Sequence, residues 1–339
     1  MGGSAGDLSS VSVKWLRRAL LSWYDQNKRD LPWRRNADPY RIWVSEIMLQ
    51  QTRVAAVLDH YARFLQRFPT VRKLAAAHES SVLAVWSGLG YYHRARRMRL
   101  AAKEIMRRRG GKFPQTAEEW RKLPGIGRYT AAAIASMAFG EPAAAVDGNL
   151  KRVLSRLSGH ADGGLTTWQR AEALLDHKCP GDFNQAMMEL GATICTPRSP
   201  KCLLCPLNRW CESRGATAFK PAGARKQKQL RYALVRRGRN VLLTRRPEDA
   251  SLMAAMWELP ALPEAQRNGC KPLARLRHSI TDTDYTVLIF PAASDGLRNG
   301  ERNTRWFSQK RWEQLPLTGL TRKVLSWVIE SGMISNESN

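Results

Sequence analysis

The chain has 339 residues, and at roughly 100–200 residues per domain this length predicts two or three domains. Lys and Arg total 55 against 29 Asp and Glu, which gives a formal net charge of +26. Such an excess is typical of proteins that bind a polyanion, either nucleic acid or an anionic membrane face, and argues against an acidic solvating protein. With 43% hydrophobic residues and 12 Trp, the chain can form packed cores and is not an unfolded tail.

Hydropathy indicates where the protein acts. The sequence has no uncharged stretch of about 18 apolar residues, so we expect no transmembrane helix and no membrane partner. Residues 1–12 are small and polar and lack the apolar core of a secretion signal. We therefore expect a reducing compartment, which is the cytoplasm with its nucleoid in a bacterium, or the nucleus or mitochondrion in a eukaryote.

The first two thirds of the chain has a helical pattern. Apolar side chains recur at helical spacing from residue 12 to about residue 212, and Pro and Gly breaks separate the segments. Convincing strand alternation does not occur in this part. We therefore predict an all-α region over residues 8–212.

The composition changes after this region. Residues 213–230 are rich in Gly, Ala, Lys, Arg and Gln, which predicts a basic linker. The segments that follow predict two strands joined by a Gly-Arg-Asn turn, a third strand and a closing helix, at residues 232–235, 241–244, 285–290 and 317–328. Residues 231–333 are therefore predicted to form a separate α+β domain.

Four of the six cysteines are crowded into residues 195–211, with the spacing C-x6-C-x2-C-x5-C. They are Cys195, Cys202, Cys205 and Cys211. Four thiolates in one short loop can enclose either a tetrahedral zinc ion or a 4Fe–4S cluster. Zinc sites usually present two C-x2-C hooks, whereas this loop has one hook with longer arms, which favours the larger cluster. Chance clustering of buried free cysteines is the remaining alternative.

A glycine-rich turn precedes the small-residue helix predicted at residues 131–138. The sequence Leu-Pro-Gly-Ile-Gly-Arg-Tyr-Thr at residues 123–130 contains Gly125 and Gly127, which permit positive φ and let backbone N–H groups point outward. The helix N-terminus that follows adds partial positive charge. This is the pattern of a helix-hairpin-helix that binds a nucleic-acid phosphate, and an ordinary interhelical turn is the alternative.

Two acidic residues have unusual neighbours. Glu46 lies in the apolar helix start Trp-Val-Ser-Glu-Ile-Met-Leu, and Asp147 lies in Val-Asp-Gly-Asn just after a predicted helix. A carboxyl group in an apolar setting has a raised pKa and can act as a general acid, while a second, ionised carboxylate can stabilise or attack a cationic sugar. The pair would suit cleavage of an N-glycosidic bond. The alternative is that both residues only cap helices, since spacing alone does not bring them together.

Taken together, these motifs resemble a known family. Residues 12–212 are similar to the endonuclease III superfamily of DNA glycosylases, because the helix-hairpin-helix, the downstream Val-Asp and the cysteine spacing follow in the same order. Further motifs resemble its adenine glycosylase branch, the MutY type: Leu-Pro-Trp-Arg at 31–34, Ser-Glu-Ile-Met-Leu-Gln-Gln-Thr at 45–52, Leu-Gly-Tyr-Tyr at 89–92 and Val-Asp-Gly-Asn at 146–149. The resemblance extends over nearly the whole chain, because this branch also carries a C-terminal Nudix-like domain.

The resemblance implies excision of adenine mispaired with 8-oxoguanine or guanine in double-stranded DNA, with one 4Fe–4S cluster, by a protein that we expect to be a monomer. It implies that Glu46 protonates adenine N7, that Asp147 stabilises or traps the cationic sugar, and that Tyr129 and Asn149 support them by hydrogen bonds. Bifunctional relatives carry a Lys at the position of Tyr129, so the resemblance implies a monofunctional enzyme without strong lyase activity.

The resemblance also implies DNA contacts. Residues matched to the adenine pocket are Arg29, Leu31, Trp33, Arg34 and Glu189. Gln51 and Tyr91 match side chains that wedge into the duplex beside the target pair, whose base must leave the stack to be reached. For Leu31, Trp33 and Tyr91 the alternative is plain core packing.

The C-terminal region departs from the family pattern. A full Nudix box is absent, so a recognition role is expected rather than pyrophosphate hydrolysis. The family reads 8-oxoguanine with a Phe-Ser-His loop after an Arg-His pair. Here Arg277, His278 and Ser279 precede the replacements Ile280, Thr281 and Asp282. Thr281 retains a hydroxyl that could contact the base, whereas Ile280 cannot stack as Phe does and Asp282 adds an anion near DNA, so altered or relaxed opposite-base recognition is predicted.

Two other functions remain open at this point. One is a superfamily glycosylase with a different target base or a lyase step, which Tyr129 and the motif around Glu46 argue against. The other is a DNA-scanning module without chemistry, which loss of Glu46 or Asp147 would have favoured.

Overall fold

The computed structural model describes residues 10–159, 165–214, 225–250, 252–262, 271–280, 282–293 and 303–333. These residues divide into two compact units. The first unit is built from residues within 1–61, 70–75 and 100–221, and the second from residues within 62–69, 76–99 and 222–339. None of the described helices is long and apolar enough to cross a membrane.

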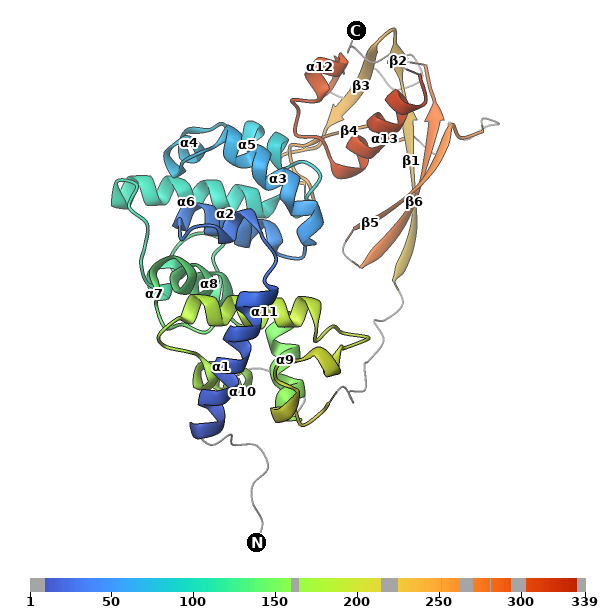
Figure 1. Cartoon of the computed structure of the whole chain (residues 1–339). Coiled ribbons are helices and arrows are strands. Elements are labelled where there is room, and N and C mark those ends of the chain that lie inside the picture. The colour runs from blue at the N-terminus through green and yellow to red at the C-terminus, as the bar shows by residue number, and fades with distance from the viewer. Residues whose placement is uncertain are drawn as a thin grey trace. The chain divides into compact units, whose positions relative to one another are not determined.

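The helices of the chain before residue 215 follow one another with short connections (Figure 1). They are α1 (Ser10–Asn27), α2 (Pro39–Leu49), α3 (Val54–Arg67), α4 (Val71–Ala76), α5 (Glu79–Trp86), α6 (His93–Arg109), α7 (Ala117–Arg121), α8 (Arg128–Phe139), α9 (Gly148–Ser158), α10 (Leu165–Leu174) and α11 (Pro180–Thr193), with the 3-10 turns η1 (Pro32–Arg34), η2 (Cys202–Leu204) and η3 (Asn208–Trp210). Described strands begin only after residue 224, so the predicted all-α region is confirmed for these residues.

Local chemistry explains where several of these helices begin. Asp38 caps α2 by accepting hydrogen bonds from the backbone N–H groups of Tyr40 and Arg41, and Pro39 occupies the first helical position. Thr116 caps α7 in the same way through the N–H of Glu119. Apolar faces of α1, α9, α10 and α11 then meet in one core, and α11 crosses α1 (Figure 1).

The second unit contains the strands. A three-stranded sheet has the order β1 (Lys226–Leu234), β6 (Thr283–Pro291), β5 (Ala274–Ile280), in which β1 and β6 are parallel and β5 and β6 antiparallel. The other sheet joins β2 (Arg236–Arg237), β3 (Asn240–Arg245) and β4 (Trp257–Glu258), and β7 (Thr304–Phe307) also pairs with β3. Two helices follow, α12 (Gln309–Trp312) and α13 (Gly319–Glu330), and α13 packs on the strands around Trp257 and Trp312 (Figure 1).

The strands predicted at 241–244 and 285–290 are confirmed with shifted ends as β3 and β6, and the closing helix is confirmed as α13. The strand predicted at 232–235 is the end of β1, which pairs with β6, and the hairpin with β3 is formed by the two-residue strand β2. The predicted linker at 213–230 is too long, because β1 already begins at Lys226, where pairing with β6 overrides the polar composition. Residues 215–224 of that linker lie outside the described part of the chain.

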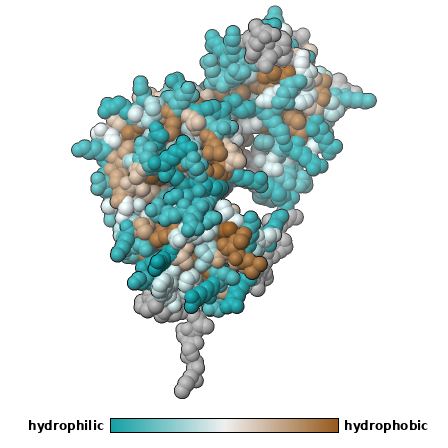
Figure 2. All heavy atoms as spheres, viewed as in Figure 1, coloured by the Kyte–Doolittle hydropathy of each residue, from teal (hydrophilic) through white to brown (hydrophobic). Residues whose placement is uncertain are grey.

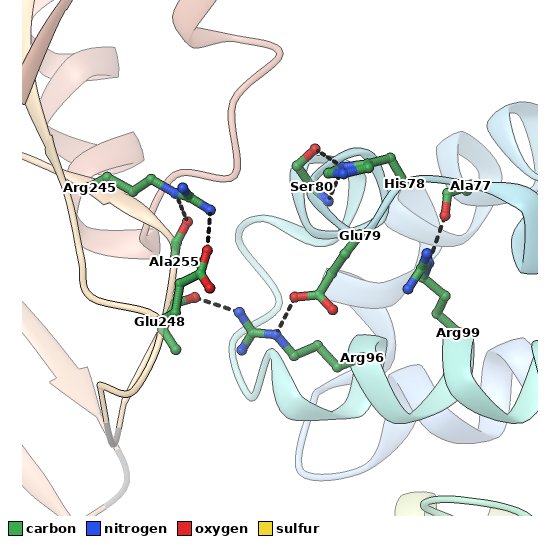
Figure 3. Close-up of polar contacts among 10 residues, drawn as sticks. Ala77, His78, Glu79, Ser80, Arg96, Arg99, Arg245, Glu248 and Ala255 are labelled. Atoms are coloured by element: carbon green, nitrogen blue, oxygen red, sulfur yellow. Dashed lines mark hydrogen bonds and ion pairs between the residues drawn. The ribbon is translucent and has the colours of Figure 1, made fainter. Parts of the chain in front are cut away.

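The second unit also includes helical residues from the first two thirds of the chain. Arg96 of α6 donates to Glu79 of α5 at 2.8 Å and to the carbonyl oxygen of Ala254 at 2.5 Å (Figure 3). Arg245 of β3 in turn donates to the Ala255 carbonyl at 3.3 Å, so one chain of contacts ties α5 and α6 to the segment after β3. The sequence pattern divides the chain into a helical part and a strand-containing part. The compact units follow spatial contacts instead, so residues 62–69 and 76–99 of the helical part belong to the second unit.

Polar residues cover most of the face visible in Figure 2, in keeping with the 55 Lys and Arg of the chain. Large apolar side chains that remain exposed include Leu203 and Leu204, which are 96% and 65% exposed on η2.

Candidate active site

Glu46 lies in the middle of α2, which is buried over nearly its whole length. Its side chain is held by the hydroxyl of Tyr129 on the adjacent helix α8, which donates to Oε2 at 2.8 Å. Burial raises the pKa of Glu46 from 4.5 to about 7, against the lowering effect of the Tyr129 hydrogen bond, and nearby Asp147 raises it further. Because Glu46 lies inside α2, it does not cap a helix. Because its pKa is raised, its carboxyl group keeps its proton up to near-neutral pH.

Asp147 is the N-cap of α9, as one of the sequence alternatives held. Its Oδ1 accepts from the Leu150 N–H at 2.6 Å, and its Oδ2 accepts from Asn149 Nδ2 at 3.0 Å. Asn149 is fixed in turn by Arg152, which donates to its Oδ1 at 2.8 Å. Capping and the hydrogen bond to Asn149 set the direction of the carboxylate.

Both carboxyl groups line one pocket of about 170 Å³ in the first unit. A single water needs roughly 10–15 Å³ on this measure, so the pocket is far larger than a hydration site. The structure thus brings together Glu46 and Asp147, which spacing alone left apart. Further lining residues are Arg29, Leu31, Trp33, Arg34, Leu49, Thr52, Val54, Met137, Asn149, Gln185, Met188, Glu189 and Ala192.

All five residues predicted for the base pocket are therefore at its wall. Glu189 is a fully buried carboxylate that pairs with Arg29 at 2.5 Å and Arg34 at 2.8 Å. Burial opposes ionisation, but the two guanidinium groups hold the pKa of Glu189 below its usual value. Leu31 and Trp33 are buried as well, and Trp33 packs edge-on against Tyr61 at 5.2 Å between ring centroids. These two residues line the pocket and belong to the core at the same time.

The two predicted wedge residues share an unusual backbone. Gln51 has a φ of 55° and Tyr91 a φ of 46°, in the left-handed region that residues other than Gly rarely adopt. Such strain costs about 1–3 kcal/mol and concentrates at functional sites. The ring of Tyr91 lies under the Arg94 guanidinium, 5.3 Å from the ring centroid. Propensity does not reveal positive φ at Gln or Tyr.

The helix-hairpin-helix turn is present with one correction. Gly125 has a φ of 80°, as expected, but Gly127 has a φ of −87° and is the N-cap of α8. A Cβ at Gly127 would meet nothing within 4 Å, so the space beside this N-cap residue is open. The next residue, Arg128, stacks on Trp168 with 3.8 Å from its guanidinium to the ring centroid.

The cysteine loop packs against the core of the first unit through Cys195, Cys205 and Cys211. Burial raises the pKa of the Cys205 thiol to about 11, and the charges of Cys195, Cys211 and Cys202 raise it further. A set of four thiols fits both zinc and an iron–sulfur cluster. Within the described ranges no three His, Cys, Asp or Glu side chains lie close enough together to hold one metal ion, so the choice between zinc and a cluster rests on the family comparison.

Sequence reasoning missed two arginines that hold this loop. Buried Arg156 donates to the carbonyl oxygens of Thr196 at 2.7 Å and Pro197 at 2.9 Å, and to Cys195 Sγ at 3.3 Å. Arg152, one turn earlier on α9, donates to the carbonyl oxygen of Cys195 at 2.9 Å. The signal available in the sequence was two arginines four residues apart on the helix that follows Asp147.

The predicted recognition segment is the end of a hairpin rather than a free loop. His278 and Ser279 lie in β5, because each pairs across to β6, and only Thr281 and Asp282 separate the strands. Ser279 Oγ donates to Asp284 Oδ1 at 2.6 Å, and the Asp282 carboxylate pairs with Lys226 at 3.4 Å. Thr281 and the side chain of Ile280 lie outside the described residues.

Comparison with known proteins agrees with this geometry. The HhH-GPD superfamily of base excision DNA repair proteins matches residues 44–180, and the iron–sulfur binding domain of endonuclease III matches residues 195–211. Adenine DNA glycosylase from Homo sapiens is 50% identical over 223 residues, which cover 61% of this chain and 40% of that protein. The same enzyme from Arabidopsis thaliana is 38% identical over 315 residues, covering 77% of this chain and 50% of that protein. The chain thus spans about half or less of these relatives.

Solved structures give the same fold. A thermostable thymine-DNA glycosylase superposes with a TM-score of 0.58 at 30% identity, over 61% of this chain and 99% of that one. An endonuclease III in a non-covalent DNA complex superposes with a TM-score of 0.54 at 24% identity over 61% of this chain and 97% of that one.

The chain belongs to the helix-hairpin-helix superfamily of base excision DNA repair glycosylases. The glycine turn before α8, the pocket that contains both carboxyl groups and the cysteine loop all agree with this membership. Residues 195–211 are its iron–sulfur binding domain. The adenine DNA glycosylases from Homo sapiens and Arabidopsis thaliana are 50% and 38% identical to this chain over the matched residues, and its motifs resemble this MutY branch of the superfamily.

Proposed function

We propose that this protein removes adenine mispaired with 8-oxoguanine or guanine from duplex DNA by hydrolysing the N-glycosidic bond. The observation that carries the proposal is the buried Glu46 carboxyl group, with its pKa raised to about 7, in a pocket that also contains the Asp147 carboxyl group. A proton donor and an anion in one site are what departure of a purine from a sugar requires.

The reaction follows from these positions. The adenine leaves the stack and enters the pocket, because the bond cannot be reached inside a duplex. Glu46 donates its proton to adenine N7, the bond from the sugar C1′ to N9 breaks with its electron pair on the base, and Asp147 stabilises the cationic sugar. Water then adds its oxygen to C1′, and its released proton restores Glu46. Tyr129 and Asn149 keep the two carboxyl groups oriented through the hydrogen bonds described above.

The pocket supports a monofunctional enzyme. A lyase step needs an amine nucleophile that forms a Schiff base with the sugar. Among the described residues that line the pocket none is Lys, and Tyr129 stands where bifunctional relatives carry one. We therefore propose that the strand stays intact after base release.

The cofactor that we propose is one 4Fe–4S cluster held by Cys195, Cys202, Cys205 and Cys211. When bound, it would fix the conformation of the loop, and the arginines of α9 would hold the loop against the helix through their hydrogen bonds. Arg198, Lys201 and Arg209 lie in or beside the loop and place cations where a DNA phosphate can reach them. The α+β region is proposed to act as a Nudix-like recognition domain for the opposite base.

The test is single-turnover release of adenine from duplexes that pair it with 8-oxoguanine, guanine, cytosine or thymine, using cluster-loaded protein. Glu46→Gln should lower the rate by about 10²–10⁴-fold, the usual range for a general acid, whereas Glu172→Gln, the same change at an exposed position, should not. Release that is undiminished in Glu46→Gln, or absent from every duplex, would overturn the proposal. Strand cleavage without alkali would overturn its monofunctional part.

A further inference from the structure

The loop that carries Tyr91, residues 87–92, is clamped within the second unit although its backbone is strained. Trp86 Nε1 donates to the carbonyl oxygen of Gly90 at 3.1 Å. Buried Arg94 donates to the carbonyl oxygens of Leu89 at 3.2 Å and Gly90 at 3.3 Å. These bonds hold φ values of 108°, 70° and 46° at Gly88, Gly90 and Tyr91. We call these residues the Tyr91 loop.

Both ends of the Tyr91 loop are bonded to the start of α13. The carbonyl oxygen of Leu317 accepts the hydroxyl of Ser87 at 2.6 Å and that of Tyr92 at 3.3 Å. Arg322, in the first turn of α13, donates from Nε to Ser87 Oγ at 3.0 Å. Ser87 is 3% exposed, so water does not compete for these bonds and their loss would leave polar groups without partners.

The same helix start also contacts the recognition hairpin, which we define as residues 277–284. Lys323 Nζ donates to the carbonyl oxygen of Arg277 at 3.0 Å. A Cβ at Gly319 would lie 3.9 Å from His278 Cε1 and 3.9 Å from the Tyr92 hydroxyl, so these two side chains flank the same residue. Residues 317–323 therefore touch both segments that were matched to DNA contacts in this unit.

We propose that residues 317–323 couple the Tyr91 loop to the recognition hairpin, so that sensing of the opposite base and insertion of Tyr91 into the duplex occur as one step. This inference rests on the proposed function. Ser87, Tyr92 and Lys323 are then positioning residues for opposite-base discrimination, because they act through the Tyr91 loop and the recognition hairpin. The physical basis is preorganisation. Through a rigid link, a correct opposite base bound at the recognition hairpin stabilises the inserting conformation of the Tyr91 loop, and a wrong base destabilises it.

The first experiment needs no DNA. Hydrogen exchange of the cluster-loaded protein is compared between the parent chain and Ser87→Ala. Amides of the recognition hairpin should exchange about three- to tenfold faster in the variant, as expected when one link of a hydrogen-bonded network is lost. The matched control is Ser331→Ala, which removes a hydroxyl bonded to the Val328 carbonyl oxygen at 3.2 Å just after the C-terminal end of α13. Unchanged exchange in the hairpin, or an equal change in the control, would overturn the coupling.

The second experiment measures the ratio of single-turnover rates opposite 8-oxoguanine and opposite guanine. Ser87→Ala and Tyr92→Phe should each change this ratio about three- to tenfold, and Ser331→Ala should leave it unaltered. Lys323→Gln changes an exposed side chain and should leave the fold intact while it changes the ratio in the same way. Lys323→Arg keeps the hydrogen-bond donor and should retain the parent ratio.

A double-mutant cycle separates coupling from general damage. Tyr91→Ala and Ser279→Ala should act non-additively on the ratio in the parent chain and additively in the Tyr92→Phe background. Additivity in both backgrounds would refute the inference. If no duplex releases adenine, the proposed function fails, and the exchange experiment still decides whether the hairpin and the Tyr91 loop are coupled.

Discussion

Glu46 provides a direct test of the site through its pKa. This pKa is raised from 4.5 to about 7 in the folded chain, where the side chain is only 5% exposed. Between these pH values the folded protein keeps a proton that the unfolded chain releases, so the unfolding free energy falls as pH rises. At about 1.4 kcal/mol per pH unit the total loss is about 3 kcal/mol, complete above pH ~7.

Because Gln cannot ionise, Glu46→Gln should escape this loss. Its unfolding free energy relative to the parent chain should rise by about 2–3 kcal/mol between pH 5 and pH 8. Urea unfolding of the cluster-loaded proteins, followed by Trp fluorescence at several pH values, measures this difference. The rate of base release by the parent should fall about tenfold per pH unit above pH ~7. A stability difference that does not vary with pH would refute the raised pKa and with it the role of Glu46 as a neutral acid.

Three further outcomes are expected. Tyr129→Phe removes the hydrogen bond that lowers the pKa of Glu46, so the midpoint of the pH–rate profile should move upward, and a fixed or lower midpoint would contradict this. Gly181→Ala should lower the unfolding free energy by about 1–3 kcal/mol in denaturant titrations, because its Cβ would lie 2.7 Å from the Ser136 carbonyl oxygen. Gly127→Ala, where the space is open, should leave the unfolding free energy unchanged and weaken duplex binding in a titration. Arg156→Ala removes the donor to Thr196 and Pro197, so iron should be lost to a chelator faster than from the parent, and equal retention would show that the loop does not depend on this contact.

The opposite-base preference is where this chain differs most from the family pattern. The Asp282 carboxylate, expected to repel DNA, is paired with Lys226, and the Ser279 hydroxyl already bonds Asp284. The hairpin therefore presents less free negative charge than its sequence suggests. Any change in specificity is then expected from Ile280 and Thr281 and from the way α13 holds the hairpin.

What could be predicted from the sequence depended on local chemistry. Helical spacing distinguished the helices from the strands, and residue types alone indicated the Gly-rich turn before α8. The spacing of the four cysteines predicted the iron–sulfur binding loop. Glu46 and Asp147 attracted attention because an acid in an apolar segment is costly unless it is used. The linker was overestimated because pairing partners of β1 lie far away in the chain.

Tertiary structure decided the rest, because these features depend on residues distant in sequence. The hydroxyl that holds Glu46 comes from Tyr129, 83 residues further along the chain, and Glu189 neutralises Arg29 from 160 residues away. The strained backbone at Gln51 and Tyr91 exists because packing around these turns overrides local preference. Likewise, Leu317 receives hydroxyls from Ser87 and Tyr92 only once the chain has folded back on itself, since 230 and 225 residues separate the partners. Composition and spacing thus determined which residue types this protein can use for chemistry, and long-range packing determined which of them meet.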